Sequence, residues 1–413
     1  MKKIIVIGAG AQGNVVAGVL SAQDDIDTVM LADIDIGRAN EVAEVLGSPK
    51  IKTVKVDASN LDALTAVIKE GGYYAVVNAT VSEFNRNIIE AALAAKVNYL
   101  DMASDEILES KRKTTPQDPF LVDQLDYAKD FEDAGLKAFI LIGSDSGTVN
   151  VMAKEAADEL DEVDYIGIKD YGFVECDEPV AHWSFPTYLG DCADEPIWWE
   201  DGEYKIGEPF SGEEEHYFEP PMDRKVKVYY HLHEEPITIP KFIGKPVKYC
   251  DFKMGEPGSE MWEFMLEGLG LMDEDPIDVK GVKVVPRDVF FALLPKSMTP
   301  KQCMELVKSK RLFSRMQVEV DVKGKRGGKK YHYKLWTDNP SVVETCSRIK
   351  GTNDLSYMAS LPVSIATLMM MRGQLKQNGV FPAETLDKEE RKIFFAGLEE
   401  WGIKVNKRVK EIK

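Results

Sequence analysis

Two aspartates, Asp101 and Asp145, occupy positions at which this sequence would place acid–base chemistry. The apolar run NYL stands directly before Asp101, and the run FILIG is followed by Ser144 and then Asp145. Both runs are typical of a buried β-strand. If both runs belong to one parallel sheet, their carboxyl ends meet at the edge where open α/β sheets bind ligands. Two carboxylates there can orient an amine and accept its proton, with pKa values tuned by partial burial. The alternative is that either aspartate only caps the helix that follows it.

Further candidates for a substrate pocket follow the point near residue 150 at which the sequence pattern changes. His231 and His233 stand two residues apart in YYHLHEE, which predicts that they share one face of a strand. Such a pair can bind a metal ion, but no third ligand stands in an evident motif, so we expect a polar pocket wall and no metal. The predicted catalytic residues are Asp101, Asp145, Tyr171 and His182, and the predicted substrate-binding residues are Trp183, His231 and Arg287.

The clearest binding motif is Gly8-x-Gly10-x-x-Gly13, between the β-branched run at residues 4–7 and the helix-forming segment NVVAGVLSAQ. The first glycine permits a sharp turn, the second permits close approach of a pyrophosphate, and the third permits the helix to pack on the strand. The next apolar run ends at Asp33, about 20 residues beyond Gly13, where an acid can bind the ribose hydroxyls. We therefore predict a dinucleotide site; the alternative is an ordinary strand–turn–helix.

Asp33 favours NAD over NADP, because its charge would repel a 2′-phosphate. Arg38 lies nearby and would soften that preference, so NAD is the expected cofactor, with NADP also accepted. The ends of the third and fourth predicted strands should border the adenine and the nicotinamide, respectively. The predicted cofactor-binding residues are Gly8, Gly10, Ala11, Gln12, Gly13, Asp33, Asp57, Ala58, Asn78, Ala79 and Thr80.

Six apolar runs alternate with helix-forming segments of about a dozen residues over the first 148 residues, which predicts βαβ units. The charged, proline-containing stretch 105–120 interrupts them as a loop. The expected strands cover 4–7, 27–33, 51–57, 73–80, 98–104 and 136–143. Six strands with five crossovers predict a Rossmann domain, a doubly wound parallel sheet, over residues 1–148.

Residues 149–344 show strands without regular crossovers, which predicts an α+β domain with a mainly antiparallel sheet. We expect this domain to bind substrate and to form a homodimer through its sheet, where Trp183, Trp198 and Trp199 would lie. KGKRGGK reads as a hairpin turn. The expected strands cover 163–172, 225–231, 247–254, 314–323 and 329–336, and the expected helices 258–269, 286–294, 299–310, 357–376 and 387–401.

Composition narrows the function classes. The 413 residues carry a formal charge of −19, which argues against a nucleic-acid partner and is compatible with a cationic substrate. No apolar run approaches the roughly 20 residues needed to cross a bilayer, and the first apolar run is too short for a signal peptide. Five scattered cysteines without a CxxC motif predict reduced thiols rather than a disulfide frame. We therefore expect a cytoplasmic protein without a membrane partner.

Several longer motifs resemble the saccharopine dehydrogenase-like family, which includes saccharopine reductases, lysine 6-dehydrogenase and carboxynorspermidine dehydrogenase. The resemblance covers nearly the whole chain. It implies a Rossmann domain, an inserted α+β domain, and final helices (about 345–413) that pack back on the Rossmann part. The similar segments are GAGAQG, VNATVSEFNRNIIEAALAAKVNYLD, GSDSGTVN, GLGLMDEDPIDVKGVKVVPRDVFFALLP and KGTNDLSYMASLPVSIATLMMMRGQLKQNGVFPAETLD.

The resemblance also implies hydride transfer between NAD(P) and a carbon bonded to an amino-acid nitrogen. The family's G-x-D-P-G turn appears as Gly143 to Gly147, with Ser146 in place of the proline, and this implies that Asp145 is the active-site acid. The arginine-bearing segment of saccharopine reductases has no clean match, and YYHLHEEPITIP is closer to the lysine and carboxynorspermidine branches.

The expected function is therefore NAD(P)-dependent oxidation or reduction at the C–N bond of a lysine-like or polyamine-like amino acid. One alternative is a dehydrogenase for the C–O bond of a semialdehyde or hydroxy acid, with His182 or His231 as the base. Another is a dinucleotide-binding sensor without turnover, since fold alone does not fix chemistry.

Overall fold

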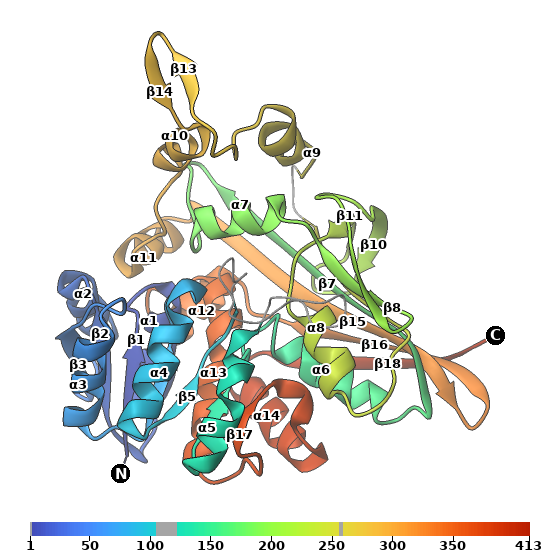
Figure 1. The fold of residues 1–413 in the computed structure, drawn as a ribbon, viewed down its shortest axis with the longest axis horizontal. Helices are drawn as coiled ribbons and strands as arrows, with labels where there is room; N and C mark the ends of the chain where they lie inside the picture. The colour runs from blue at the N-terminus through green and yellow to red at the C-terminus, as the bar shows by residue number, and fades with distance from the viewer. Residues whose placement is uncertain (1, 105–121, 256–258) are drawn as a thin grey trace.

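Seven parallel strands form the first sheet, in the order β17-β6-β5-β4-β1-β2-β3 (Figure 1). The computed structural model describes residues 2–104, 122–255 and 259–413, so the loop predicted over 105–120 lies outside the described residues. The order of the first six strands confirms the predicted doubly wound sheet. These strands are β1 (Lys2–Ile7), β2 (Ile26–Asp33), β3 (Ile51–Lys55), β4 (Ala75–Asn78), β5 (Asn98–Leu100) and β6 (Lys137–Phe139).

Helices cover both faces of this sheet, and β1 shows why its sequence is uniformly apolar. Ile4 and Val6 lie in one hydrophobic cluster and Ile5 and Ile7 in another, on the opposite face. Asp35 caps α2 by accepting from two backbone N–H groups. The helices are α1 (Ala11–Ser21), α2 (Ile36–Leu46), α3 (Leu61–Gly71), α4 (Asn85–Ala95) and α5 (Ala128–Asp133), with 3₁₀ turns η1 (Ser82–Phe84) and η2 (Asp123–Tyr127).

The second sheet has nine strands, of which seven follow the order β10-β11-β12-β7-β15-β16-β18 while β8 pairs with β12 and β9. Only the β7–β12 pair is parallel among these described pairs, so the predicted mainly antiparallel sheet is confirmed. The strands are β7 (Glu162–Cys176), β8 (Ile197–Glu200), β9 (Glu203–Ile206), β10 (Glu214–Phe218), β11 (Arg224–Tyr230), β12 (Tyr249–Gly255), β15 (Leu312–Arg326), β16 (Lys329–Asp338) and β18 (Lys404–Ile412).

A group of short helices and one small hairpin stands beyond the second sheet, at the top of Figure 1, and we call it the cap. It consists of α7 (Phe185–Ala193), α9 (Ser259–Glu263), the π-helix η3 (Phe264–Gly268), the hairpin β13 (Ile277–Val279)–β14 (Val282–Val284) and α10 (Pro286–Leu293). Its own hydrophobic cluster, built around Tyr188, Leu189 and Leu266, holds it together. Two helices pack on the second sheet, α6 (Thr148–Ala157) on β15 and α8 (Glu235–Phe242) on β12. A third helix, α11 (Pro300–Lys308), contacts α2.

The C-terminal segment links the two sheets. Strand β17 (Gly379–Phe381) pairs with β6 in the first sheet, whereas β18 pairs with β16 in the second. Helix α13 (Asp354–Met371) packs on α1 and also contacts β15. By length and composition alone α13 could cross a membrane, but 89% of it is buried inside the protein, so it serves as a core helix. The remaining elements are α12 (Val342–Arg348), the 3₁₀ turn η4 (Ala383–Thr385) and α14 (Lys388–Glu400).

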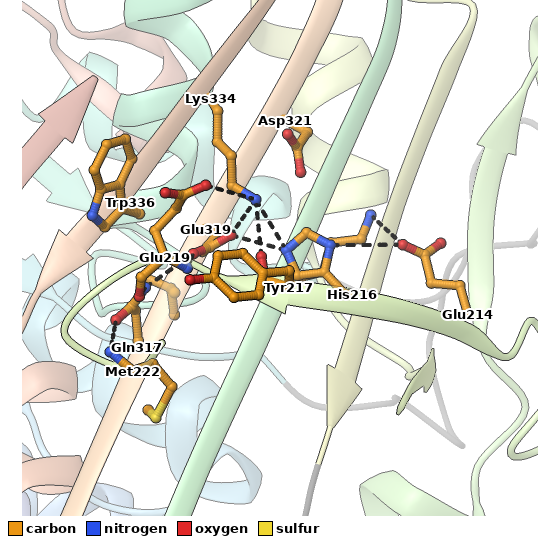
Figure 2. Close-up of polar contacts among 12 residues, drawn as sticks. Glu214, His216, Tyr217, Glu219, Met222, Gln317, Glu319, Asp321, Lys334 and Trp336 are labelled. Atoms are coloured by element: carbon orange, nitrogen blue, oxygen red, sulfur yellow. Dashed lines mark hydrogen bonds and ion pairs between the residues drawn. The ribbon is translucent and has the colours of Figure 1, made fainter. Parts of the chain in front are cut away.

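A network of buried charges joins β10, the edge strand of the second sheet, to β15 and β16 of the same sheet (Figure 2). The carboxylate of Glu319 on β15 is fully buried; it lies 2.7 Å from Lys334 Nζ and 2.9 Å from His216 Nε2. Its other oxygen accepts from Gln317 Nε2 (2.9 Å) and from the backbone N–H of Glu219 (2.5 Å). Because each oxygen has partners, the cost of burying this charge is offset within the network.

Candidate active site

A cavity of about 1580 Å³ opens at the carboxyl ends of the first sheet's strands and continues beneath the second sheet and the cap. The residues that line the cavity come from both sheets and from the cap. The glycine motif forms one end, and residues of the β6–α6 turn, β7 and the cap form the other. This position, outside the carboxyl ends of parallel strands, is where α/β sheets bind ligands.

The glycine motif has the close packing that a dinucleotide site needs. Gly8 has φ +102°, and a Cβ there would lie 2.5 Å from Ala79 O; a Cβ on Gly13 would lie 1.9 Å from Gly8 O. Only glycine therefore lets β1, α1 and β4 approach this closely. Gly8 and Gly10 line the cavity, whereas Gly13 supports the turn from behind. The turn is a cradle that fits a pyrophosphate at the start of α1.

Asp33 is held in place by the same turn. Its Oδ2 accepts from Ala9 N (2.7 Å) and its Oδ1 from Asp35 N (2.8 Å). The Arg38 guanidinium lies 4.0 Å from the position that a Cβ on Gly10 would take. The glycine turn is therefore flanked by the positive charge of Arg38 and the negative charge of Asp33. Ten of the eleven predicted cofactor-binding residues line the cavity, namely Gly8, Gly10, Ala11, Gln12, Asp33, Asp57, Ala58, Asn78, Ala79 and Thr80.

Asp145 lines the cavity where β6 gives way to α6. Its pKa is raised to about 6, because burial and the nearby carboxylate of Glu235 outweigh the opposing charge of His233. Its carboxyl group hydrogen-bonds that of Asp170 on β7, and for this one of the two must carry a proton. One carboxyl group of the pair therefore carries a proton, and the raised pKa of Asp145 suits it to acid–base chemistry.

His233 provides a positive charge beside this pair. Its Nδ1 lies 2.7 Å from Glu235 Oε2 and 3.2 Å from Glu234 Oε2, and these carboxylates raise its pKa well above the usual value. The three side chains could hold a metal ion, since their ligand atoms lie within 4.8 Å of one another. A metal ion would have to displace the proton of His233, since both would bind the same ring nitrogen.

The pKa of His231 is shifted in the opposite direction from that of His233. Burial and the charge of His233 lower its pKa to about 3, so the ring is neutral. The two histidines do not share a strand face as predicted, because β11 ends at Tyr230 and both follow it in an irregular turn before α8. The prediction failed because YYHLHEE alternates like a strand, while α8 begins at Glu235, two residues after His233, with Pro236 in its first turn.

Asp101 also borders the cavity, but both of its oxygens are engaged. Oδ1 accepts from Leu141 N (2.7 Å) and Oδ2 from Gln124 Nε2 (3.0 Å). The side chain is 1% exposed, and burial raises its pKa to about 7. These contacts join the end of β5 to the segment after β6.

Comparison with known proteins agrees with this geometry. The family model for the saccharopine dehydrogenase NADP-binding domain matches residues 4–139, and that for the saccharopine dehydrogenase C-terminal domain matches 143–403. The chain belongs to the saccharopine dehydrogenase family. It is an NAD(P)-binding oxidoreductase of that family, as the sequence motifs predicted.

Named relatives extend over the whole chain. A carboxyaminopropylagmatine dehydrogenase from Synechocystis is 27% identical over 414 residues, covering 98% of this chain and 96% of its own. A carboxynorspermidine synthase from Vibrio alginolyticus is 29% identical over 402 residues, covering 94% and 92%. Among solved structures, a saccharopine dehydrogenase (L-Glu forming) from Saccharomyces cerevisiae shares the fold, with a TM-score of 0.67, 16% identity and coverage of 99% and 100%.

Two of the predicted site residues lie elsewhere in this family member. Tyr171 does not line the cavity; it packs on Phe218 on the opposite face of β7, and its hydroxyl accepts from Arg224 Nη1 (3.2 Å). The prediction chose the wrong face, since neighbouring strand residues point to opposite sides and Asp170 takes the inner one. Arg287 lies on the cap, paired with Glu274 and outside the cavity lining.

His182 and Trp183 do line the cavity, as expected. His182 is buried, which lowers its pKa, and its Nδ1 lies 3.6 Å from Asp354 Oδ1. Sequence reasoning missed several residues that share this end of the cavity, because only the tertiary fold brings them together. These are Asp170, Glu234, Phe185, Tyr188, Asp194, Trp262 and Phe291. For Glu234, the sequence offered one indication, the two glutamates that directly follow His233.

Proposed function

We propose that this protein forms or cleaves a C–N bond of a polyamine-like or lysine-like amino acid by NAD(P)-dependent reduction or oxidation. The observation that carries the proposal is the group of carboxylates at the substrate end, Asp145, Asp170 and Glu234, in the same cavity as the dinucleotide cradle. Carboxylates attract a cationic amine, and Asp145, whose pKa is raised by burial, can exchange its proton.

When bound, the nicotinamide ring exchanges a hydride with the substrate carbon that carries nitrogen. Asp145 exchanges the proton. In the direction of amine oxidation, its carboxylate takes the N–H proton as the hydride leaves the carbon, so that a C=N bond remains and water can hydrolyse it. In the reverse direction an amine and an aldehyde condense with loss of water, and Asp145 returns the proton to nitrogen as the C=N bond is reduced.

The other residues of this end position the reacting groups. Asp170 holds the carboxyl group of Asp145 by a hydrogen bond, and His233 supplies a fixed positive charge that favours its ionised form. Glu234 fixes one wall, since its Oε1 accepts from Ser104 N at 2.7 Å. The neutral His231 presents a polar wall without adding a charge that would repel an amine.

The relatives support the choice of substrate, because carboxyaminopropylagmatine and carboxynorspermidine are both amines that carry a carboxyl group. A homodimer is part of the same proposal and is measurable by sedimentation. Of the tryptophans expected at its interface, Trp198 stacks on Tyr230 and Trp199 meets Tyr204 edge-on within the chain.

The test is oxidation or formation of NADH and NADPH, followed by absorbance, across a substrate panel. The panel contains lysine, saccharopine, amines paired with aspartate semialdehyde, and hydroxy acids as controls. Turnover of an amine pair or an amino acid is expected. Turnover confined to hydroxy acids would reject the C–N assignment, and tight NAD(P)H binding without any turnover would favour a sensor.

A further inference from the structure

Two cysteine side chains that the proposed reaction does not use meet between helices α11 and α12. Cys303 lies on α11 and is 1% exposed, whereas Cys346 lies on α12 and is half-buried. The two helices contact each other, and a hydrogen bond joins the two thiols. Both side chains pack with Leu306, Leu312 and Val342 in one hydrophobic cluster. The fold therefore holds a thiol that solvent can reach against one that solvent cannot reach.

The chain after α12 turns back over Cys346 and stabilises its anionic form. The backbone N–H groups of Gly351 and Thr352 both donate to the sulfur of Cys346. The hydrogen bond from Cys303, with these two N–H groups, outweighs burial and lowers the pKa of Cys346 to about 6. The same hydrogen bond, together with burial, raises the pKa of Cys303. At neutral pH the half-buried sulfur is therefore a thiolate, and the buried one is a thiol.

A thiolate in contact with a second thiol is suited to reversible oxidation. The thiolate is the nucleophilic form of cysteine, and peroxide-sensitive cysteines combine a low pKa and solvent access with a neighbouring cysteine that resolves the oxidised form. Cys346 has the low pKa and the access, and Cys303 is the neighbour. The two helices therefore carry the two roles that such a reaction needs.

We propose that Cys346 and Cys303 form a peroxide-sensitive pair, whose disulfide links α11 to α12 and weakens dinucleotide binding. The thiolate of Cys346 attacks one oxygen of hydrogen peroxide; the O–O bond breaks, hydroxide leaves and a sulfenic acid remains. The sulfur of Cys303 then attacks this sulfenic sulfur; the S–O bond breaks, and its oxygen leaves as water with the Cys303 proton. The pair has then lost two electrons to one peroxide, and a dithiol reductant restores both thiols.

The turn that holds Cys346 also supports the dinucleotide cradle. Thr352 Oγ1 accepts from Asn14 Nδ2 of α1 at 2.8 Å. A Cβ on Gly351 would lie 2.4 Å from Pro300 Cβ, so the turn packs closely on the start of α11. Formation of the disulfide removes the negative sulfur to which the buried N–H groups of Gly351 and Thr352 donate. The turn should therefore shift, and the contact of Thr352 with α1 should shift with it.

The test treats the intact wild-type protein with hydrogen peroxide and maps crosslinked peptides by mass spectrometry without reduction. We expect one disulfide, between Cys303 and Cys346, which forms faster as pH rises through about 6 and is reversed by dithiothreitol. After the peroxide is removed, NAD(P)H affinity measured by fluorescence titration should be about fivefold lower than before oxidation and should recover on reduction.

Three variants separate the roles of the two thiols. Cys303→Ser keeps a hydrogen-bond donor beside Cys346 but cannot resolve it, so a sulfenic acid at Cys346 should accumulate and be trapped by dimedone. Cys346→Ser should give neither the sulfenic acid nor the disulfide, and its NAD(P)H affinity should not respond to peroxide. Cys176→Ser is the matched control, because Cys176 is also half-buried and packs against the same cluster. It should respond to peroxide as the wild type does.

The opposite results are equally clear. A wild-type protein in which Cys346 stays reduced, or in which the mapped disulfide includes Cys176, would overturn the assignment of the pair. Unchanged NAD(P)H affinity in the protein that carries the mapped disulfide would overturn its link to the dinucleotide cradle. Neither result bears on the proposed function, because C–N chemistry at Asp145 is measured on the reduced protein.

Discussion

Asp145 is the residue at which a single substitution tests the chemistry most directly. Asp145→Asn keeps the size of the side chain but removes the proton acceptor, so we expect kcat to fall by about 10²-fold to 10³-fold. NAD(P)H affinity, measured by fluorescence titration, should not change, because the glycine cradle and Asp33 are untouched.

The pH dependence of the wild-type rate tests whether Asp145 acts as a base in amine oxidation and as an acid in the reductive direction. Burial raises the pKa of Asp145 to about 6. Amine oxidation needs the carboxylate, so its rate should rise as pH increases through about 6. The reductive direction needs the carboxylic acid, so its rate should fall over the same range.

Asp101 provides the matched control for Asp145. Its pKa is also raised by burial, but both of its oxygens accept hydrogen bonds from Leu141 N and Gln124 Nε2. Asp101→Asn should therefore retain most of kcat and keep the transition near pH 6. If Asp101→Asn removes that transition and Asp145→Asn does not, the two aspartates have been assigned the wrong way round.

Among the elements, the β10 strand depends on a buried charge for its position. Glu319→Gln leaves Lys334 without its nearest counter-charge, because Glu219 lies 3.9 Å away. Breaking one side of a buried ion pair should lower the free energy of unfolding by about 3 kcal/mol, measured by urea denaturation. Glu215→Gln on β10 is the control, since the pair of Glu215 with Lys225 is exposed and should contribute little. Equal effects of the two substitutions would contradict the importance of the buried network.

How well each element could be predicted followed from how local its signal is. Strands β1 to β6 alternate with amphipathic helices, so their positions and the cofactor residues at their ends could be predicted from spacing alone. Strand β17 has three residues, and its partner β6 lies about 240 positions away, so no local pattern marks it. Helix α8 was missed because PITI is rich in β-branched residues and is held by tertiary contacts with β12.

The residues of the candidate site also differ in whether a local sequence pattern could place them. Asp145 and Asp101 follow strands that the apolar pattern predicts, so the sequence was enough to place both at the ligand-binding edge of the sheet. Tyr171 and Asp170 are neighbours on β7, and choosing between them needs the strand register, which a one-residue shift reverses. Phe185 and Trp262, which line the cavity, come from two cap helices more than 70 positions apart, and only the tertiary fold brings their rings together.

In the whole molecule, a few residues of the C-terminal segment join the dinucleotide cradle to the substrate end of the cavity. Asn14, buried in α1, donates from Nδ2 to Lys350 O (3.1 Å) and to Thr352 Oγ1 (2.8 Å). The next residue, Asn353, donates to His182 O (2.9 Å) at the substrate end. The two halves should therefore unfold together rather than as independent domains.

Tryptophan fluorescence can test this coupling, because all six tryptophans lie at or beyond residue 183 and none lies in the first 148 residues. NAD(P)H binds to the first sheet, so a coupled molecule should show one thermal transition, with the tryptophan-monitored Tm rising as much as the Tm from far-UV circular dichroism. Asn14→Ala should reduce the coupling, since it removes both bonds to the 350–352 segment while leaving the glycine cradle intact. Two separate transitions in the wild type, with only the circular dichroism transition moved by NAD(P)H, would show that the sheets are independent. The C-terminal segment would then contribute packing alone, and substrate and cofactor affinities should be measurable without any mutual influence.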